Sequence, residues 1–350
     1  MPSVIPRTAA LLASVALAGC ASLPPGRGYS EAAALVESRI GTEVAWPWPS
    51  AAAAGSTALI PDQPIGVDQA IRLTLERNPR VREVYARLGV GRAELEEARR
   101  IANPTFGYTE LDAQGAAGSQ ITRTVSLSLA DLLLLSARKR FAEGELERLQ
   151  SRAAADLVDL VAEVEVAWYD NVSAGQVAAM RDIVAKAAEH SAELAQRFFD
   201  AGNIDRLQLE RELAAAAQAR IDAVRAAADV LHTRSALAAL LGLPLGAPWR
   251  TVEQLPAPPP VASDADAMVK LALDQRLDLA AAQREVVLLE DALGVTRRWR
   301  WLGSVEVGYE RETEIDDIVL RGPSLSVELP IFNQGQGAIA RARAELDAAR

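Results

Sequence analysis

The sequence predicts a mainly α-helical fold with four β-strands, in which long helical hairpins form an α-barrel and the strands join a transmembrane β-barrel that is shared on trimerisation. Residues 132–199 contain no proline and many alanines, and alanine is the best helix former. Segments near residues 125 and 325 alternate apolar with polar residues, which is typical of strands with one wetted face. The same order of segments occurs twice, about 200 residues apart, so the chain is a tandem repeat.

Composition narrows the class of protein. Half of the 350 residues are apolar, which is enough to build a sizeable core. The net charge of −10 argues against a nucleic-acid partner, because phosphate backbones are bound by basic surfaces. Cys20 is the only cysteine, so a disulfide framework and a cysteine-based metal cluster are excluded.

The N-terminus accounts for that cysteine. Arg7 precedes an apolar stretch over residues 8–18 that is too short to span a bilayer. The Leu-Ala-Gly before Cys20 resembles a bacterial lipobox, which implies a lipoprotein signal peptide over residues 1–19 and lipid attachment, palmitate included, at Cys20. Ala21 after the cysteine favours sorting to the outer membrane in such lipoproteins. The alternative is an ordinary secretory signal with a chance cysteine.

The next segment, residues 20–66, is rich in proline, glycine, alanine and serine and shows no sustained period. This indicates an extended, lipidated N-terminal arm or linker. A helical pattern then begins, and Asn78 and Pro79 mark the capped start of a second helix. Two strands are expected over residues 105–111 and 121–129.

A long helix is expected over residues 132–199, and roughly 65 residues at 1.5 Å each give a rod of about 100 Å. A break at residues 200–203 precedes a return helix over residues 204–241, which makes an antiparallel hairpin. The return helix repeats apolar and small residues by seven, which predicts two rows that face a neighbouring helix. One row is Leu207, Ala214, Ile221, Ala228 and Ser235, and the other is Ala217, Val224, Leu231 and Ala238.

A proline-rich linker over residues 244–263 separates the first repeat, 67–243, from the second, 264–350. The second repeat supplies a helix, strands at 305–309 and 324–329 and the start of a further helix. It contains no counterpart of residues 151–243, so we expect the sequence to be a fragment or a truncated gene product. Matching positions include Leu73 with Leu271, Leu75 with Leu273 and Leu127 with Val327.

The strands carry the main functional prediction, because their apolar residues alternate with serine, glutamate or glycine. One face would then meet an apolar medium and the other water. On pattern alone, a soluble sheet over a core is the commoner case. However, four strands cannot close a barrel and a membrane tolerates no open sheet edge, so a spanning role requires several chains in one barrel. The predicted lipid-facing residues are Val125, Leu127, Leu129, Val305, Val307, Tyr309, Leu325, Val327 and Leu329.

Over residues 67–350 the duplicated unit of helix, two strands, long helix and return helix resembles the outer membrane efflux protein family typified by TolC. Residues 197–205 resemble the family's aromatic-x-x-Gly turn at the periplasmic tip of the first hairpin, and residues 329–335 resemble its strand-to-helix corner. Membership implies a homotrimer whose twelve-stranded barrel continues into a tunnel of twelve helices. It also implies docking to a periplasmic adaptor (membrane fusion) protein and an inner-membrane pump. Gating residues usually lie in the second hairpin, so none is carried over.

The resemblance assigns adaptor contact to the tip of the hairpin. Gly202 is predicted to supply a left-handed turn conformation without strain. Asp200 and Asp205 would ring the tunnel mouth and attract cations, or remain solvated surface carboxylates. Trp299 and Trp301 would lie in an interfacial aromatic belt or pack in a core. The predicted tip residues are Phe199, Asp200, Gly202, Asn203 and Asp205.

No catalytic or metal-binding constellation emerges from the sequence. His190 and His232 are the only histidines, and they lie on opposite arms of the expected hairpin, so a ligand set for copper, silver or zinc is lacking. Glu163 and Glu165 are helix carboxylates of an abundant type, without a histidine partner or a nucleophile. We therefore predict no catalytic residue, no cofactor and no enzyme.

The predicted function is the outer-membrane channel of a tripartite efflux or type I secretion system. The protein would be lipid-anchored in the outer membrane, extend into the periplasm, contact outer-membrane lipids and passively export small molecules such as drugs or metal ions. The alternative is a periplasmic coiled-coil adaptor or structural lipoprotein. Paired membrane-facing strands in each repeat favour the channel.

Overall fold

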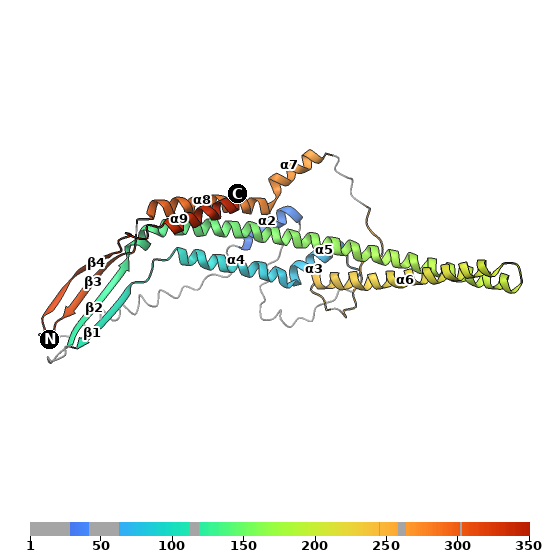
Figure 1. Ribbon diagram of the computed structural model, residues 1–350, viewed down its shortest axis with the longest axis horizontal. Helices are drawn as coiled ribbons and strands as arrows, with labels where there is room; N and C mark the ends of the chain where they lie inside the picture. The colour runs from blue at the N-terminus through green and yellow to red at the C-terminus, as the bar shows by residue number, and fades with distance from the viewer. Residues whose placement is uncertain (1–28, 42–62, 113–118, 245, 258–263, 302) are drawn as a thin grey trace.

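The computed structural model describes residues 29–41, 63–112, 119–244, 246–257, 264–301 and 303–350. The molecule is strongly elongated, with a β-sheet at one end and a helical hairpin at the other (Figure 1). The strands are β1 (Thr105–Asp112), β2 (Ser119–Ser128), β3 (Val305–Thr313) and β4 (Val319–Val327). The helices are α2 (Tyr29–Ile40), α3 (Val67–Arg77), α4 (Pro79–Ala98), α5 (Leu129–Asp200), α6 (Arg206–Leu240), α7 (Ala265–Gln275), α8 (Leu277–Trp299) and α9 (Gln336–Ala349). The expected mainly helical fold with four strands is thus confirmed.

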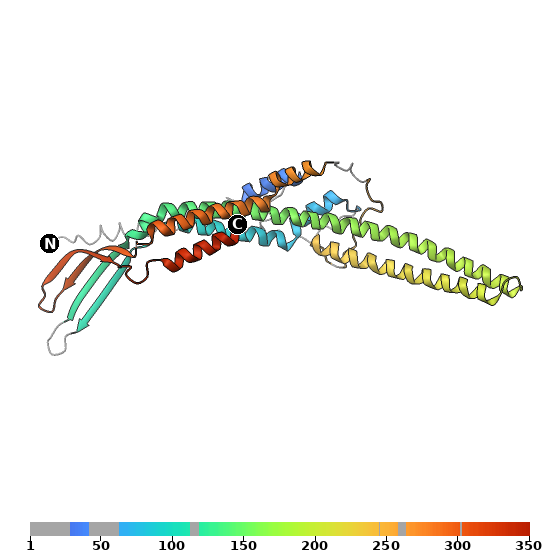
Figure 2. The same ribbon diagram turned by 45° about the horizontal axis from the view of Figure 1, so that its top comes forward.

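The four strands form one antiparallel sheet in the order β1-β2-β3-β4. Each repeat contributes one β-hairpin, and the two hairpins join along β2 and β3. β1 and β4 are therefore the two edges, each with a single neighbouring strand. The sheet curves away from the helices, and none of the described helices covers either of its faces (Figures 1 and 2).

Helix α5 runs from the sheet to the far tip and organises the molecule (Figure 2). Its 72 residues span about 108 Å at 1.5 Å per residue. Ser128 caps its start, because the Ser128 side chain accepts a hydrogen bond from the backbone N–H of Asp131 at 3.2 Å. Helices α4 and α8 pack along its first half, where a side chain at Gly144 would collide with Leu288 of α8. The predicted rod is therefore confirmed.

The core lies in the middle of the rod, where α2, α3, α4 and the end of α6 meet α5. Trp168 of α5 is 2% exposed, and its indole N–H donates to the Ile65 carbonyl at 2.9 Å. The side chain of Asn78 donates to the Leu240 carbonyl at 2.8 Å and also caps α4, as predicted. The first bond ties the segment before α3 to α5, and the second ties the start of α4 to the end of α6.

The expectation of an extended arm over residues 20–66 was wrong for Tyr29–Ile40, which form helix α2. Ala32 and Val36 of this helix are fully buried against the core, and the Tyr29 ring meets the Tyr85 ring of α4 edge-on at 6.0 Å. Few of its side chains are buried and most of these are small, so the sequence showed only a weak helical period of apolar residues. The signal peptide and Cys20 lie outside the described residues.

The hairpin of α5 and α6 has the expected seven-residue period but a different phase. Leu207, Val224 and Leu231, taken from the two predicted rows, are 60%, 65% and 66% exposed. Alanines occupy the seam on both helices, and small side chains let two backbones approach closely, which leaves the bulkier residues outside. Ala238 is the one residue of the predicted rows that is buried. The buried seam residues are Ala185, Ala192 and Ala195 of α5 with Leu209, Ala216, Ala226, Leu237 and Ala238 of α6.

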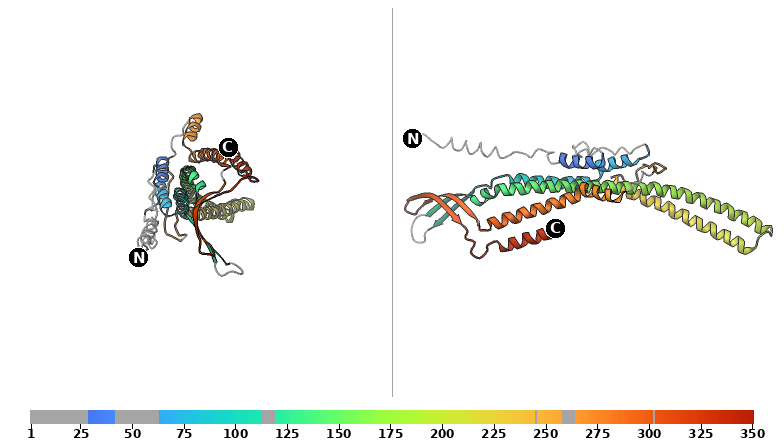
Figure 3. Two further views of the ribbon diagram at one scale, coloured as in Figure 1. Left: turned by 90° about the vertical axis from the view of Figure 1, so that its left-hand side faces the viewer. Right: turned by 90° about the horizontal axis from the view of Figure 1, so that it is seen from above.

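The two repeats differ in how their first helices are covered (Figure 3). Leu73 and Leu75 of α3 are 7% and 3% exposed, because they pack into the core beside α5. Their counterparts in α7, Leu271 and Leu273, are 55% and 62% exposed, and α7 has no buried residue. Among the described residues, α7 has no equivalent of the helices that cover α3.

Candidate functional site: the two faces of the sheet

The predicted apolar strand residues lie together on one face of the sheet. Val307 lies opposite Leu127 on one side and opposite Leu325 on the other, and Val125 lies opposite Tyr309. Opposite residues, and every second residue along a strand, share a face. We call this the outward face, and its apolar members are Phe106, Tyr108, Ile121, Val125, Leu127, Val305, Val307, Tyr309, Val319, Pro323, Leu325 and Val327.

Within the described part of the single chain, no other element covers the outward face. Phe106 is 67% exposed, Val125 50%, Tyr309 53% and Leu325 69%. Soluble monomers seldom expose a contiguous apolar surface that extends over several strands. This face therefore needs an apolar partner outside the chain.

Two predicted lipid-facing residues, Leu129 and Leu329, lie outside the strands. Leu129 is the first residue of α5, and Leu329 lies two residues beyond the end of β4. The chain leaves the sheet earlier than the alternation suggested, because Ser128 becomes a helix cap. Both side chains are exposed, Leu129 by 38% and Leu329 by 70%, so they continue the apolar surface beyond the strand ends.

The opposite face of the sheet, which we call the polar face, is built mainly from small polar residues and carboxylates. The Ser126 hydroxyl lies 3.4 Å from the Glu306 carboxylate of the next strand, and the Gln120 amide donates to Glu312. Leu111 and Leu320 are the apolar exceptions on this face. The other members are Thr105, Gly107, Thr109, Thr122, Thr124, Ser128, Gly308, Glu310, Gly322, Ser324 and Ser326.

Both strands of the second hairpin are longer than predicted, and their outer ends carry charged residues that were not predicted as site residues. β3 continues to Thr313 and β4 begins at Val319. This register places Arg311 opposite both Arg123 and Arg321 on the outward face. The signal was present in the sequence, because each arginine continues the alternate positions of its strand, but a charged residue ended the apolar pattern.

The tip of the hairpin is a compact turn between α5 and α6. Gly202 has a φ of +76°, a left-handed conformation that glycine adopts without strain. The N–H of Asn203 donates to the Phe198 carbonyl at 2.8 Å, and the N–H of Gly202 donates to the Phe199 carbonyl at 2.9 Å. This pair of bonds is a Schellman motif, so the predicted role of Gly202 is confirmed.

The two tip carboxylates have local structural partners. Asp205 is the N-cap of α6, and its side chain accepts from the Gln208 N–H at 2.7 Å. Asp200 accepts from the Gln196 amide at 2.9 Å. Both residues and Phe199, which is 36% exposed, lie on the surface.

Trp299 and Trp301 lie where α8 passes into β3, at the level where the sheet begins. Trp299 is half-buried, and Trp301 is 53% exposed with the Arg300 guanidinium 4.6 Å from its ring centre. Neither side chain belongs to the buried core. The aromatic-belt alternative therefore fits the exposure of Trp301 better than core packing does.

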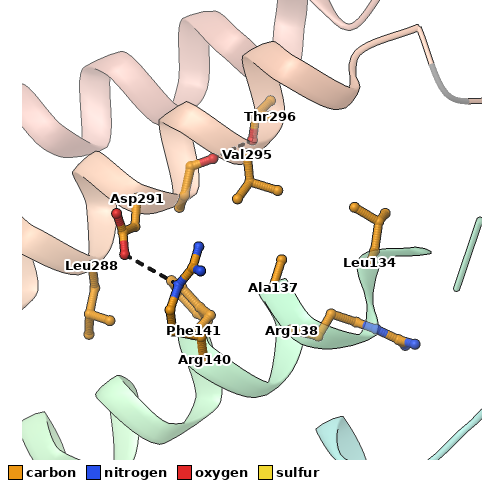
Figure 4. A pocket seen from close by; sticks show the side chains of 10 residues that line it. Leu134, Ala137, Arg138, Arg140, Phe141, Leu288, Asp291, Val295 and Thr296 are labelled. Atoms are coloured by element: carbon orange, nitrogen blue, oxygen red, sulfur yellow. Dashed lines mark hydrogen bonds and ion pairs between the residues drawn. The ribbon is translucent and has the colours of Figure 1, made fainter. Parts of the chain in front are cut away.

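An open groove lies between the start of α5 and the second half of α8 (Figure 4). Leu134, Phe141 and Val295 give it a mainly apolar lining, and Arg140 and Asp291 form an ion pair across it at 3.7 Å. It holds no pairing of a nucleophile with a base, so it offers no catalytic chemistry. It is a gap between neighbouring helices.

Two ion pairs outside the sheet lower the pKa of their carboxylates, one between helices and one at a helix junction. Arg80 of α4 binds both carboxylate oxygens of Glu163 on α5, the second at 3.1 Å, and this hydrogen bonding lowers the pKa of Glu163. Arg276 binds the Asp278 carboxylate in the same way at the junction of α7 and α8 and lowers its pKa to about 2. Both are exposed, structural ion pairs.

Among the described residues, no group of three histidine, aspartate or glutamate side chains is arranged to hold a metal ion. The described helices contain no segment that is both long and apolar enough to cross a bilayer.

Comparison with solved structures defines the class to which this fold belongs. A membrane protein from Pseudomonas aeruginosa is 18% identical, with a TM-score of 0.65 over 81% of this chain and 71% of that one. The Campylobacter jejuni CmeC outer membrane channel has a TM-score of 0.65 at 13% identity, over 81% and 66% of the two chains. The Neisseria gonorrhoeae MtrE outer membrane channel gives 0.60 at 18%, over 81% and 68%. The fold is that of outer-membrane channels.

The family follows from the sequence itself. Residues 70–243, about half of the chain and nearly all of the first repeat, match the model of the outer membrane efflux protein family. The chain belongs to the outer membrane efflux protein family, whose members are channel proteins rather than enzymes. A search of curated proteins found no match.

Proposed function

We propose that this protein is one subunit of an outer-membrane efflux channel that passively exports small molecules, such as drugs or metal ions, from a periplasmic pump assembly to the exterior. The observation that carries the proposal is the two-faced sheet. Its outward face is apolar and uncovered, and its polar face is lined by serine, threonine and glutamate. A wall with water on one side and hydrocarbon on the other requires this distribution.

The proposed number of chains follows from the number of strands that a closed barrel needs. The sheet has free edges at β1 and β4, and unpaired backbone groups at such edges are not tolerated in hydrocarbon. Four strands are too few to close a barrel around a channel. Three chains would pair β4 of each copy with β1 of the next and form a twelve-stranded barrel, with the α5–α6 hairpins side by side below it. The exposed stripe of Leu207, Val224 and Leu231 would then face a neighbouring chain.

Two measurements test the channel together. Outer-membrane fractions should contain a trimer band that dissociates on heating, and the purified protein should produce stepwise single-channel conductance in a planar bilayer. A water-soluble monomer without conductance would refute the channel and favour the periplasmic adaptor class. A trimer without conductance would refute passive transport by this component alone.

We further propose that the tip formed by Phe199, Asp200, Gly202, Asn203 and Asp205 contacts a periplasmic adaptor protein. The tip is the most remote part of the molecule from the sheet (Figure 1), so it is the part that would reach across the periplasm. Replacing Asp200 with arginine should weaken capture of the adaptor without changing trimer formation. The matched control is Asp229→Arg on the same hairpin, and equal adaptor capture by both variants would contradict the proposal.

The lipid anchor at Cys20 is also a proposal, and the length of the tether supports it. Tyr29 of α2 contacts α4 at Gly89, and Gly91, two residues further along α4, contacts Leu149 of α5. Leu149 lies 20 residues along α5 from the sheet, or about 30 Å. The nine residue steps from Cys20 to Tyr29 reach at most about 30 Å, which is enough to place an acylated cysteine near the start of the sheet. Cys20→Ser should abolish incorporation of radiolabelled palmitate, and retained label would refute this site.

A further inference from the structure

We propose that Arg123, Arg311 and Arg321 form a binding row for the phosphate groups of membrane lipids in the leaflet next to the loop end of the sheet. The three side chains come from three adjacent strands and lie in one cross-strand row, with Arg311 opposite Arg123 on one side and Arg321 on the other. We call them the arginine row. The proposal rests on the proposed function, because it requires the outward face to meet a bilayer.

The arginine row lies at one end of the apolar part of the outward face, where the hydrocarbon layer of a bilayer would end. The outward positions of β4 are Val327, Leu325 and Pro323 before Arg321 is reached, which is about 20 Å of strand at 3.3 Å per residue. The exposed Leu329 continues this surface toward the helices. For strands tilted by about 40°, this length gives about 15 Å of apolar height, and about 20 Å when Leu329 is included, against the band of about 25 Å that membrane barrels present. The arginines therefore lie where head groups replace hydrocarbon.

The row has no counter-charge of its own. All three arginines are exposed, and none forms an ion pair with another described residue on the sheet or the helices. The nearest carboxylate on the outward face is Glu110, which accepts hydrogen bonds from the Tyr108 hydroxyl at 2.7 Å and from Ser119 at 3.1 Å. The glutamates of β3 point to the polar face instead.

Like charges directly opposite each other destabilise a sheet, and guanidinium groups stay charged at all physiological pH values. An anion that bridges the three guanidinium groups would therefore stabilise this arrangement. Phosphate fits, because the planar guanidinium donates two parallel hydrogen bonds to its oxygens. Below the row the outward face is apolar and holds the acyl chains of the same lipid. Tyr108, whose ring lies 5.9 Å from the Arg123 guanidinium, orients one end of the row.

The test measures how much lipid A, a phosphorylated glycolipid, binds to the full-length protein purified in a neutral detergent. The variant is R123Q/R311Q/R321Q, and the matched control is R211Q/R220Q/R225Q, which removes three exposed arginines from helix α6 with the same change in net charge. We expect the row variant to bind at least tenfold more weakly and the control to bind as the wild type does. Lysine at the three row positions should restore part of the affinity, because it keeps the charge but not the paired hydrogen bonds.

Each outcome decides a separate point. Equal binding by the row variant and the wild type would overturn the arginine row as a lipid site. Complete displacement of lipid A by inorganic phosphate would identify a free-phosphate site and overturn the lipid assignment. If the triple variant fails to assemble, R321Q alone, on the edge strand, is measured against R220Q. Trimer formation and conductance are recorded for every variant. If the wild type inserts and conducts but the row variant binds lipid A equally well, the arginine-row proposal is refuted and the channel proposal is not.

Discussion

A lysine in the middle of the outward face should prevent membrane insertion. Val307 is the central apolar position of β3, and it has Leu127 opposite on one side and Leu325 on the other. Val307→Lys would place an ammonium group near the middle of the apolar layer, where lysine costs about 2–4 kcal/mol in membrane barrels. At 1.4 kcal/mol per factor of ten, the folding equilibrium would shift by about 30-fold to 700-fold per chain.

The matched control is Ser126→Lys on the polar face, where the neighbouring Glu306 favours a positive charge. Both proteins are unfolded in urea and refolded into phospholipid vesicles, and the folded fraction is read from the heat-sensitive shift in gel mobility. Val307→Lys should lose most of the folded fraction, and Ser126→Lys should retain it. Equal loss in both variants would refute the assignment of the two faces, because it would show that neither position distinguishes hydrocarbon from water.

Three further predictions concern the helical part, each measured by thermal unfolding. Gly202→Ala should destabilise the hairpin by about 1–2 kcal/mol, because the left-handed conformation crowds a Cβ; an unchanged midpoint would contradict the turn geometry. Trp168→Phe should cost about 1–3 kcal/mol, because the buried Ile65 carbonyl loses its donor; a smaller loss than in an exposed control, Trp301→Phe, would contradict this. Burial raises the pKa of Tyr85 to about 12, above about 10 in the unfolded chain, so stability should fall as pH rises from 10 to 12. Tyr85→Phe should flatten that decline, and identical pH curves would refute it.

Local signals in the sequence predicted most element boundaries. Asn78 and Pro79 act through the geometry of their own residues, and Gly202 acts through its freedom to adopt a positive φ. The absence of proline from residues 132–199 likewise predicted the long helix, which ends within three residues of the expected bounds at each end. Such features depend little on the rest of the fold.

Features that depend on a partner surface were predicted less well. The period of α6 was correct, but its phase was not, because which face is buried depends on the alanine seam of α5. Helix α2 was missed because its buried residues, Ala32 and Val36, are too few to establish a period. The outer ends of β3 and β4 were not predicted, because the strands were recognised by apolar residues at alternate positions and Arg311 and Arg321 occupy two of those positions.

The exposed stripe on α6 has a consequence for the life of the newly made chain. In a chain that assembles as proposed, leucine and valine side chains such as Leu207, Val224 and Leu231 lie in water on α6 until the subunits meet. Such a surface attracts holdase chaperones and proteases, and it promotes self-association when concentration rises. Secretion faster than assembly should therefore shorten the half-life of the chain, so the rate of partner encounter limits how much mature protein accumulates.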